Sequence, residues 1–309
     1  MEFSHYSVLL KESVDLLGVR EGGVYVDGTM GGGGHSEEIL SRGAGRLIGI
    51  DRDTDAIAAA TARLAPYGDR LTAVHANFCE IKSVLDRLGT DSIDGAVLDL
   101  GVSSYQLDNA GRGFSYMHDA PLDMRMNRDD ALTAYEVINT YTEDELRRIF
   151  FEYGEEKWSK RIAGAIVKRR EKNEIETTGE LADIIKAAIP QKARADGGHP
   201  AKRVFQAVRI EVNNELKLLE GAIRDFTDVI KPGGVLSVIT FHSLEDRIVK
   251  QTFAALARGC ICPKSFPVCV CNNRPSVKIL TRKPILPRAE ELVENSRSKS
   301  AKLRAALKL

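Results

Sequence analysis

Three aspartates each stand at the end of a short apolar run in the first third of the chain. Asp27 follows residues 24–26, Asp51 follows residues 47–50, and Asp99 follows residues 93–98. Such runs suit buried parallel strands, whose carboxyl ends meet at one edge of the sheet, where ligands bind. Asp51 is expected to accept hydrogen bonds from ribose hydroxyls, while Asp27 and Asp99 flank a positive charge. The pattern therefore predicts a nucleoside ligand with a cationic tail.

A run of small residues separates Asp27 from the first expected helix. Residues 28–36 read Gly-Thr-Met-Gly-Gly-Gly-Gly-His-Ser, with four successive glycines. Glycine lacks a Cβ and costs backbone entropy, so this run suits a loop that a ligand approaches closely better than it suits an ordinary turn. The helix that begins near Ser36 would direct its free N–H groups at a carboxylate or phosphate. We therefore interpret the loop as a ligand cradle, with a plain strand-to-helix turn as the alternative.

The loop does not fit the two common nucleotide fingerprints. Counting from Gly31 and Gly33, Ser36 stands where G-x-G-x-x-G requires its third glycine, and no G-x-x-x-x-G-K-[ST] motif is present. These motifs serve dinucleotides and nucleoside triphosphates. A nucleotide-dependent oxidoreductase is therefore disfavoured.

The elements that must hold these residues follow an α/β order. Strands are expected at residues 24–27, 47–51, 71–78, 93–100 and 235–242, with a late strand at 277–281. Helices are expected at 6–17, 53–64, 158–170 and 178–189, and a long helical pattern runs from 204 to 230. Asp53 or Thr54 can cap the helix after Asp51, which leaves Asp51 available to a ligand. Phe78 ends the third strand, where it can lie against a purine or pack in the core.

A long insertion separates the fourth and fifth expected strands. Residues 101–234 far exceed a simple crossover, and they carry capping boxes at Thr142 with Glu145 and at Thr177 with Glu180. We expect a first part of the main domain at 1–106, an inserted helical substrate-recognition domain at 107–211, and the second part of the main domain with a basic tail at 212–309.

The composition is that of a globular protein without a membrane span. The 309 residues are 43% hydrophobic and 28% charged, with a net charge of zero. No apolar run approaches the ~20 residues of a spanning helix, and the N-terminus does not resemble a secretory signal. The chain is therefore expected in the cytoplasm, away from the membrane.

Positive charge is concentrated in two regions. Residues 157–209 contain 13 Lys and Arg against 6 Asp and Glu, and residues 272–309 contain 10 against 3. For any single lysine, a solvated helix face is the simpler interpretation. Two regions of about +7 in a neutral chain nevertheless favour a polyanionic substrate held at one face.

Four of the five cysteines form a cluster. Cys260, Cys262, Cys269 and Cys271 form two C-x-C pairs, and Cys79 lies apart. Four thiolates can hold a tetrahedral zinc ion, but the usual spacing is C-x2-C. A hairpin of small buried residues around Pro263 and Pro267 is therefore favoured over a zinc site.

Several motifs together resemble one known family. Residues 27–36 (DGTMGGGGHS), 98–108 (LDLGVSSYQLD), 112–115 (RGFS), 121–126 (PLDMRM) and 241–247 (FHSLEDR) are similar to the bacterial ribosomal RNA small subunit methyltransferase H family, also called MraW. The resemblance runs nearly end to end, from residues 5–10 to residues 297–304. It implies a class I S-adenosylmethionine-dependent methyltransferase, with a Rossmann-like, doubly wound, mostly parallel sheet. The implied reaction is N4-methylation of a cytidine in the decoding centre (P site) of 16S ribosomal RNA within the small subunit.

The resemblance also assigns a set of site residues. The implied cofactor contacts are Gly33, Gly34 and His35 in the loop, Asp51 on the ribose, Phe78 beside the adenine, and Asp99 and Gln106 near the methionine end. No metal is required, because positioning alone can supply about 7 to 11 kcal/mol of the barrier.

Candidates for handling the cytosine lie near the ends of the fourth and fifth strands. They are Asp99, Ser103, Ser104, Phe241, His242 and Ser243. Phe241 can stack on a cytosine turned out of the RNA and His242 can hydrogen-bond it, but Phe241 also suits the core and His242 also suits a helix cap. The proton acceptor stays open, because the (D/N/S)-P-P-(Y/F) motif of amino methyltransferases is absent.

Other interpretations remain at this point. Three arginines, Arg112, Arg125 and Arg247, are either clamps for phosphate or carboxylate groups or members of structural ion pairs with Asp123 or Glu245. A noncatalytic RNA-binding or ribosome assembly protein and an N4-cytosine DNA methyltransferase are the alternative functions. The sequence does not indicate an oligomeric state.

Overall fold

The computed structural model divides the chain into two compact units. It describes residues 7–194, 199–263, 266 and 268–309. Unit 1 comprises Met1–Gly101 and Leu216–Leu309, and unit 2 comprises Val102–Glu215. Unit 2 thus begins and ends slightly outside the insertion expected at 107–211.

Unit 1 is built on one seven-stranded sheet with the order β3-β2-β1-β4-β5-β7-β6. Its strands are β1 (Val24–Asp27), β2 (Arg46–Asp51), β3 (Leu71–His75), β4 (Ile93–Asp99), β5 (Ile230–Thr240), β6 (Val277–Ile279) and β7 (Lys302–Lys308). The first five in this order pair in parallel, whereas β7 is antiparallel to both of its neighbours. The sheet confirms the expected mostly parallel, Rossmann-like fold.

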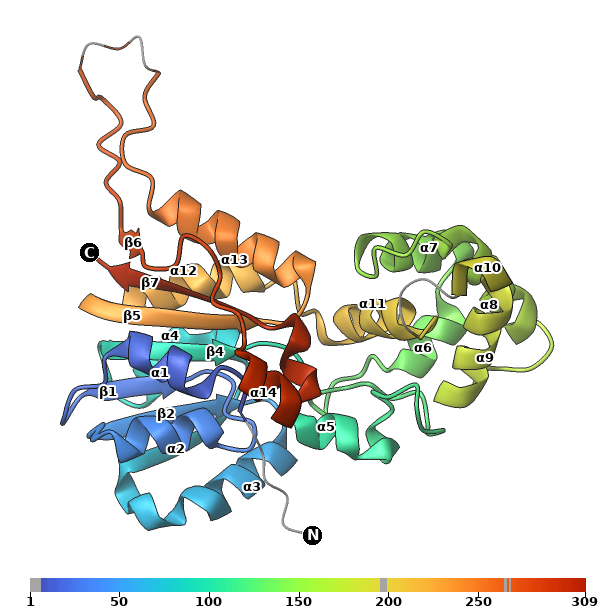
Figure 1. Cartoon of the computed structure of the whole chain (residues 1–309), viewed down its shortest axis with the longest axis horizontal. Coiled ribbons are helices and arrows are strands. Elements are labelled where there is room, and N and C mark those ends of the chain that lie inside the picture. The colour runs from blue at the N-terminus through green and yellow to red at the C-terminus, as the bar shows by residue number, and fades with distance from the viewer. Residues whose placement is uncertain (1–6, 195–198, 264–265, 267) are drawn as a thin grey trace. The chain divides into compact units, whose positions relative to one another are not determined.

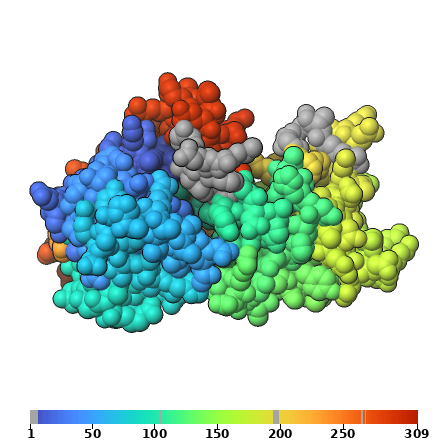
Figure 2. Space-filling model, turned by 90° about the horizontal axis from the view of Figure 1, so that it is seen from below, coloured from blue at the N-terminus to red at the C-terminus, as the bar shows by residue number. Residues whose placement is uncertain are grey.

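Helices cover both faces of this sheet (Figure 1). They are α1 (Leu10–Leu17), α2 (Gly34–Ser41), α3 (Thr54–Leu64), α4 (Ile81–Arg87), α12 (Leu219–Val229) and α13 (Ser243–Leu256). Unit 1 also contains α14 (Ala289–Glu294), which has no buried residue. Successive strand residues face opposite ways, so Tyr25 packs with α1 and α2 residues while Val26 packs with residues of α4, α12 and α13. The outer side of α3 is exposed to solvent (Figure 2).

The C-terminal segment differs from the expected basic tail. Residues 296–300 form a 3-10 turn, and Lys302–Lys308 form strand β7 between β5 and β6. Leu303 and Ala305 are buried in the sheet, and the Arg304 guanidinium pairs with Asp246 (Nε to Oδ1, 2.6 Å). The prediction of a tail was wrong because burial and pairing with β5 outweigh the weak strand propensity of Lys, Arg and Ala.

Unit 2 is helical. It contains α5 (Ser104–Asp108), α6 (Ala134–Thr140), α7 (Glu143–Glu152), α8 (Ser159–Arg170), α9 (Thr178–Ala188), α10 (Gln191–Arg194) and α11 (Lys202–Asn213). Capping boxes begin α7 at Thr142 and α9 at Thr177, as predicted. The long pattern expected at 204–230 is instead two helices, α11 and α12, because Asn214 takes a left-handed conformation (φ 51°) that ends α11.

Across the described ranges, no helix is both long and apolar enough to span a bilayer.

Candidate functional site

Three buried or partly buried carboxylates end neighbouring strands of unit 1. Asp27 ends β1, Asp51 ends β2 and Asp99 ends β4, and the parallel register brings these strand ends to the same edge of the sheet. We call Asp27, Asp51, Asp99 and the neighbouring His35 the acid edge. The side chains that the sequence predicted at one edge are therefore brought together by the fold.

The glycine loop is tied to these acids by its own hydrogen bonds. Asp27 accepts hydrogen bonds from Ser36 Oγ (2.8 Å) and Thr29 N (3.2 Å). Asp51 Oδ2 accepts one from Gly31 N (2.7 Å), and Thr29 Oγ1 accepts one from Asp99 N (2.6 Å). The carboxylates therefore fix the course of the loop between β1 and α2.

Two of the loop glycines have structural reasons beyond a ligand. Gly33 has a φ of +80°, and a Cβ there would lie 3.2 Å from Ala60 Cβ. A Cβ on Gly34 would overlap the Ser7 hydroxyl. The left-handed backbone therefore favours glycine at position 33, whereas a side chain at position 34 would require Ser7 to move.

Two buried polar atoms of the acid edge are unpaired. Among the residues that the structure describes, His35 Nε2 and Asp99 Oδ1 have no hydrogen-bond partner. His35 Nδ1 lies 3.9 Å from Asp99 Oδ2, which is too far for a hydrogen bond. Buried polar atoms without partners are rare, and they mark positions where a bound group would supply the missing bond.

Burial shifts the protonation equilibria of these groups. It raises the pKa of Asp27 to about 6, against the opposing hydrogen bonds from Ser36 and Thr29. The pKa of Asp99 is raised well above its usual range, first by burial and then by the negative charges of Asp27, Glu245 and Glu291. Burial lowers the pKa of His35 to about 4, so that its ring is neutral at pH 7. A cation bound beside these acids would favour their charged forms.

Asp51 and Phe78 occupy the ends of the next two strands. Asp51 Oδ1 accepts a hydrogen bond from Asp53 N (2.9 Å), and burial raises the pKa of Asp51. Asp53 caps α3 through Asp55 N, so the capping role weighed for Asp51 is filled by its neighbour. Phe78 is half-buried at the start of a 3-10 turn just beyond β3, which ends at His75, three residues earlier than expected.

These residues fit the predicted cofactor, S-adenosylmethionine. The unpaired His35 Nε2 and Asp99 Oδ1 offer hydrogen bonds, and the excess of carboxylates suits a sulfonium cation. Asp51 ends β2 and Phe78 lies just beyond β3, in the region where a ribose and an adenine would be held in a nucleotide-binding fold. The fit rests on residues of unit 1 alone.

The end of β5 supplies two of the candidates for handling the base. Phe241 is partly exposed, and a Cβ added to Gly101 would lie 3.6 Å from its ring, so Phe241 adjoins the segment that leaves β4. His242 caps α13, with Nδ1 3.5 Å from Glu245 N, while the buried Glu245 accepts hydrogen bonds from Phe241 N (2.8 Å) and His242 N (3.2 Å). The helix-cap role weighed for His242 is therefore present in the structure.

The remaining candidates belong to unit 2. Ser103 caps α5: its hydroxyl accepts from Gln106 N (3.2 Å), and Gln106 Oε1 accepts from Ser103 N (3.1 Å). Gln106 is buried. Ser104 begins α5, but its side chain lies outside the described residues. The cofactor role of Gln106 and the catalytic roles of the two serines stay predictions.

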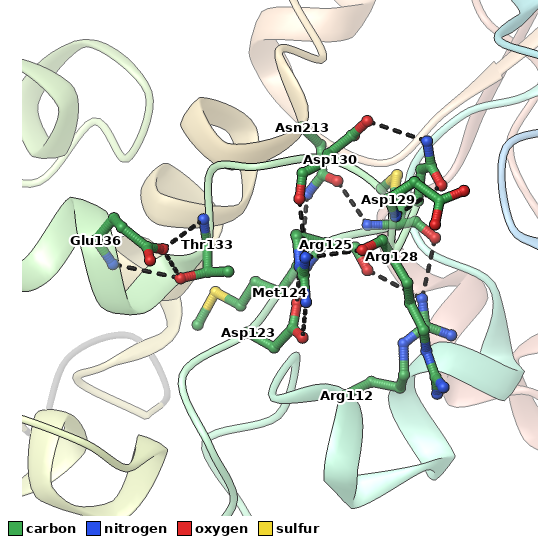
Figure 3. A network of polar contacts seen from close by, with 12 residues as sticks. Arg112, Asp123, Met124, Arg125, Arg128, Asp129, Asp130, Thr133, Glu136 and Asn213 are labelled. Atoms are coloured by element: carbon green, nitrogen blue, oxygen red, sulfur yellow. Dashed lines mark hydrogen bonds and ion pairs between the residues drawn. The ribbon is translucent and has the colours of Figure 1, made fainter.

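Unit 2 contains a second buried polar cluster, shown in Figure 3. Arg125 forms a bidentate ion pair with Asp123 (2.8 and 2.9 Å). The buried Arg112 donates to the carbonyls of Arg125 (2.9 Å) and Met126 (3.0 Å), and Asn213 receives a hydrogen bond from Met126 N (2.7 Å). We call Arg112, Asp123, Arg125 and Asn213 the arginine network. It gives Arg112 and Arg125 the structural role that was the alternative to a ligand clamp. No local sequence pattern points to Asn213.

The basic region at 157–209 contains two kinds of residue. Arg170 donates to the carbonyls of Ile138 and Tyr141, and Arg209 pairs with Glu215 (2.9 Å), so both are structural. By contrast, Lys160 and Arg161 on α8 are exposed, and neither has an ion pair within the described part of the chain. The charge available to a polyanion is therefore smaller than the sequence count.

The four clustered cysteines converge. Their Sγ atoms all lie within 4.8 Å of one another, and each is a free thiol. The prediction that small residues are buried in this hairpin was wrong, because Cys260, Pro263 and Cys269 are exposed, and Pro267 lies outside the described residues. The thiols nevertheless converge, so a hairpin and a metal site are not exclusive interpretations of this segment.

Comparisons with known proteins identify similar chains over the full length. The model of the MraW methylase family matches residues 2–309. "Ribosomal RNA small subunit methyltransferase H 2" of Agathobacter rectalis is 59% identical over 307 residues, which cover 98% of each chain. "Ribosomal RNA small subunit methyltransferase H" of Carboxydothermus hydrogenoformans is 57% identical over 309 residues, which cover 100% of this chain and 99% of the relative. Among solved structures, an rRNA methylase from Streptococcus thermophilus aligns with a TM-score of 0.44 and 10% identity, over 98% of each chain.

Proposed function

Because the chain belongs to the MraW methylase family, we propose that it methylates N4 of one cytidine in the decoding centre (P site) of 16S ribosomal RNA. Family membership makes the chain an S-adenosylmethionine-dependent methyltransferase of ribosomal RNA. The base, the atom and the small-subunit context are the proposal, and the names of the relatives support the small subunit as substrate.

The observation that carries the reaction is the unpaired carboxylate oxygen at the end of β4. Asp99 Oδ1 is buried and has no partner among the described residues, although the Asp99 side chain as a whole is 23% exposed. A carboxylate in this state can accept a hydrogen bond from an amino group that enters the acid edge. Cytosine N4 carries two such hydrogens, which a keto oxygen or ring carbon lacks.

S-adenosylmethionine, when bound, supplies an electrophilic methyl group on a positively charged sulfur. The task of the protein is to align cytosine N4, whose lone pair is delocalised into the ring, and to take up the proton that N4 loses. A hydrogen bond to Asp99 would localise the N4 lone pair, and the Asp99 carboxylate would then accept the proton. The raised pKa of Asp99 makes it a stronger base than an ordinary aspartate once it is ionised.

Phe241 and His242 are proposed to hold the base. Phe241 is partly exposed beside Gly101, so its ring can stack on a cytosine turned out of the RNA. The capping box of α13 fixes His242, whose side chain is 8% exposed with Nε2 3.1 Å from Glu245 Oε1. A hydrogen bond from its imidazole to the base edge or a phosphate would replace that contact. Ser103 and Ser104 are kept as further candidates from unit 2.

The basic residues of unit 2 are proposed to bind the RNA backbone. Lys160 and Arg161 are exposed on one helix, as phosphate contacts require. We therefore propose that most cofactor and base contacts come from unit 1, with Ser103, Ser104 and Gln106 as the candidates from unit 2, and that the exposed basic residues of unit 2 add affinity for RNA.

The test is mass spectrometry of nucleosides from small-subunit RNA that is unmodified at the target. Free RNA, assembled small subunits and duplex DNA are each incubated with the protein and S-adenosylmethionine, with Asp99→Ala as the paired control. We expect N4-methylcytidine in RNA only, and none with the variant. Methylation of duplex DNA would indicate a DNA methyltransferase. Cofactor binding without methylation of any substrate would indicate a noncatalytic RNA-binding protein.

A further inference from the structure

An extended hairpin without regular structure leads from α13 to β6. Within residues 257–276, the described part contains no helix or strand, and it carries Cys260, Cys262, Cys269 and Cys271. In Figure 1 this segment projects from the end of the sheet opposite to the start of α13. Since α13 begins just after the carboxyl end of β5, the hairpin lies at the far end of unit 1 from the acid edge.

The sulfur atoms of the hairpin have the spacing of a metal tetrahedron. Cys269 Sγ lies 3.6 Å from Cys271 Sγ, which lies 3.7 Å from Cys260 Sγ, and all four sulfurs are within 4.8 Å of one another. A disulfide requires about 2.05 Å between sulfurs. A tetrahedral zinc ion with Zn–S bonds of about 2.3 Å holds its sulfurs about 3.8 Å apart.

Backbone N–H groups point at two of the sulfurs in a reciprocal pattern. Ile261 N donates to Cys271 Sγ, and Val270 N donates to Cys262 Sγ, each at 3.3 Å. The backbone N–H of the middle residue in each C-x-C pair thus donates a hydrogen bond to the second cysteine of the other pair. N–H donors of this kind stabilise thiolates, which are the form that binds metal.

No apolar core accounts for this convergence. The large apolar residues of the hairpin, Ile261, Phe266, Val268 and Val270, are all at least 50% exposed. At the base of the hairpin, Asn273 Nδ2 joins the two arms by donating to the carbonyls of Arg258 (2.9 Å) and Gly259 (2.7 Å). Cys260 and Cys269 are themselves exposed, and Cys262 and Cys271 are only partly buried, so burial does not hold the thiols together. The segment therefore requires some other source of stability, as small metal-bound modules do.

We propose that Cys260, Cys262, Cys269 and Cys271 bind one structural zinc ion that orders this hairpin. The four thiolates complete the tetrahedron and leave no position for substrate or water, so the site is structural. Each cysteine that binds as a thiol releases its proton to solvent, and no electron is transferred. The tight C-x-C spacing, which disfavoured zinc in the sequence, is compatible with it here because the ligands come two from each arm of the hairpin.

Metal content of the purified full-length chain tests this proposal. We expect one zinc per chain by elemental mass spectrometry, and loss of that zinc in Cys260→Ser/Cys271→Ser. The matched control is Cys79→Ser, which removes the one cysteine outside the hairpin and should retain the metal. Cobalt reconstitution should give the absorption bands of tetrahedral thiolate coordination in the control and not in the double variant.

Limited proteolysis gives a readout that does not depend on activity. Removing zinc with a chelator should speed cleavage at least tenfold within residues 257–276 while cleavage elsewhere is unchanged, and adding zinc back should reverse the effect. The proposal is overturned if the purified chain contains no metal, or if it contains iron in place of zinc. It is also overturned if the double variant retains zinc, or if thiol titration and peptide mapping find two disulfides in the hairpin.

Discussion

The acid edge and the arginine network both bury charged side chains, but they treat them in opposite ways. In the network, Arg125 has a bidentate partner in Asp123, and its remaining amino group donates to the carbonyls of Arg128 and Asp130. At the acid edge, the negative charge of Asp27 raises the pKa of Asp99, and Asp99 Oδ1 has no partner among the described residues. The network stabilises the fold of unit 2. The carboxylates of the acid edge lower the folding stability of unit 1, and a bound cation would offset this cost. The type of residue alone does not distinguish a ligand-binding site from a structural ion-pair cluster. The two differ in whether their buried polar atoms have hydrogen-bond partners within the protein.

The sharpest way to break this contrast is an isosteric change at Asp99. Asp99→Asn keeps the shape but removes the proton acceptor, so we expect methyl transfer to fall by about 10²-fold or more. The free energy of unfolding should stay equal or rise, because an unpaired buried carboxylate is removed. Single-turnover methylation of RNA and denaturant unfolding measure the two effects.

Asp123→Asn is the matched substitution in the network. It removes the bidentate partner of Arg125 and should lower the free energy of unfolding by about 1–3 kcal/mol. If Asp99→Asn retained methyl transfer within threefold, or destabilised the chain as much as Asp123→Asn, the distinction between the two regions would be lost.

A second large effect is expected at Asn213. Asn213→Ala leaves Met126 N and the carbonyls of Met124 and Arg209 without their side-chain partner. Each unpaired buried group costs about 1–3 kcal/mol, so unit 2 should lose about 2–4 kcal/mol of stability. Calorimetry, combined with proteolysis of each unit, measures the loss.

The neighbouring Asn214 provides the control for this change. It is exposed with a φ of 51°, so Asn214→Gly should change stability by less than about 0.5 kcal/mol. Equal effects at the two positions would show that backbone strain at the end of α11, and not the network, stabilises this part of unit 2.

These two regions also show how far the sequence alone could be read. The acid edge was predictable because aspartates after short apolar runs, with a glycine loop between, have one common arrangement in parallel sheets. Strand β7 was not predictable, because Lys302–Lys308 has the composition of a basic surface segment and becomes a strand only through pairing with β5. Asn213 was not predictable either, since its partners are backbone atoms almost 90 residues away. Hydrogen bonds between residues that are far apart in the sequence leave no local sequence pattern.

The pH dependence of cofactor binding tests whether the carboxylates of the acid edge interact with the positive charge of the cofactor. The pKa of Asp27 is raised to about 6 and that of Asp99 is also raised, so a bound cation favours ionisation and releases protons. Affinity for S-adenosylmethionine should therefore rise from pH 5.5 to pH 8, by up to about tenfold for each carboxylate that ionises. S-adenosylhomocysteine, which lacks the positive charge, should show a smaller rise. Calorimetric titration across this pH range tests the difference, which would be absent if the acid edge did not contact the sulfonium end.

The same shifts predict opposite effects on the apo protein. A raised acid pKa means that the folded state binds protons more tightly, so the contribution of Asp27 to stability is fully present below about pH 4 and is lost as the pH rises through about 6. Asp27→Asn should abolish this loss and so raise the free energy of unfolding at pH 8 relative to the wild type. Denaturant unfolding at pH 5 and pH 8 measures it, and a gain of equal size at both pH values would exclude ionisation of Asp27 as the cause.

The smallest effect is expected on the exposed surface of unit 2, where neither kind of buried charge is involved. Lys160→Glu/Arg161→Glu reverses two charges on α8 that have no ion pair within the described ranges, so folding should be unaffected. RNA affinity should fall by about 3–10-fold at moderate salt, with a shallower dependence on salt concentration.

The control is Arg87→Glu/Lys250→Glu on α4 and α13 of unit 1, which makes the same change in net charge at exposed positions. Filter binding to small-subunit RNA and titration of S-adenosylmethionine separate the two functions. If the α8 variant lost cofactor affinity as well, or if the control weakened RNA binding equally, net charge or a shared site would explain binding and unit 2 would have no role of its own in RNA recognition.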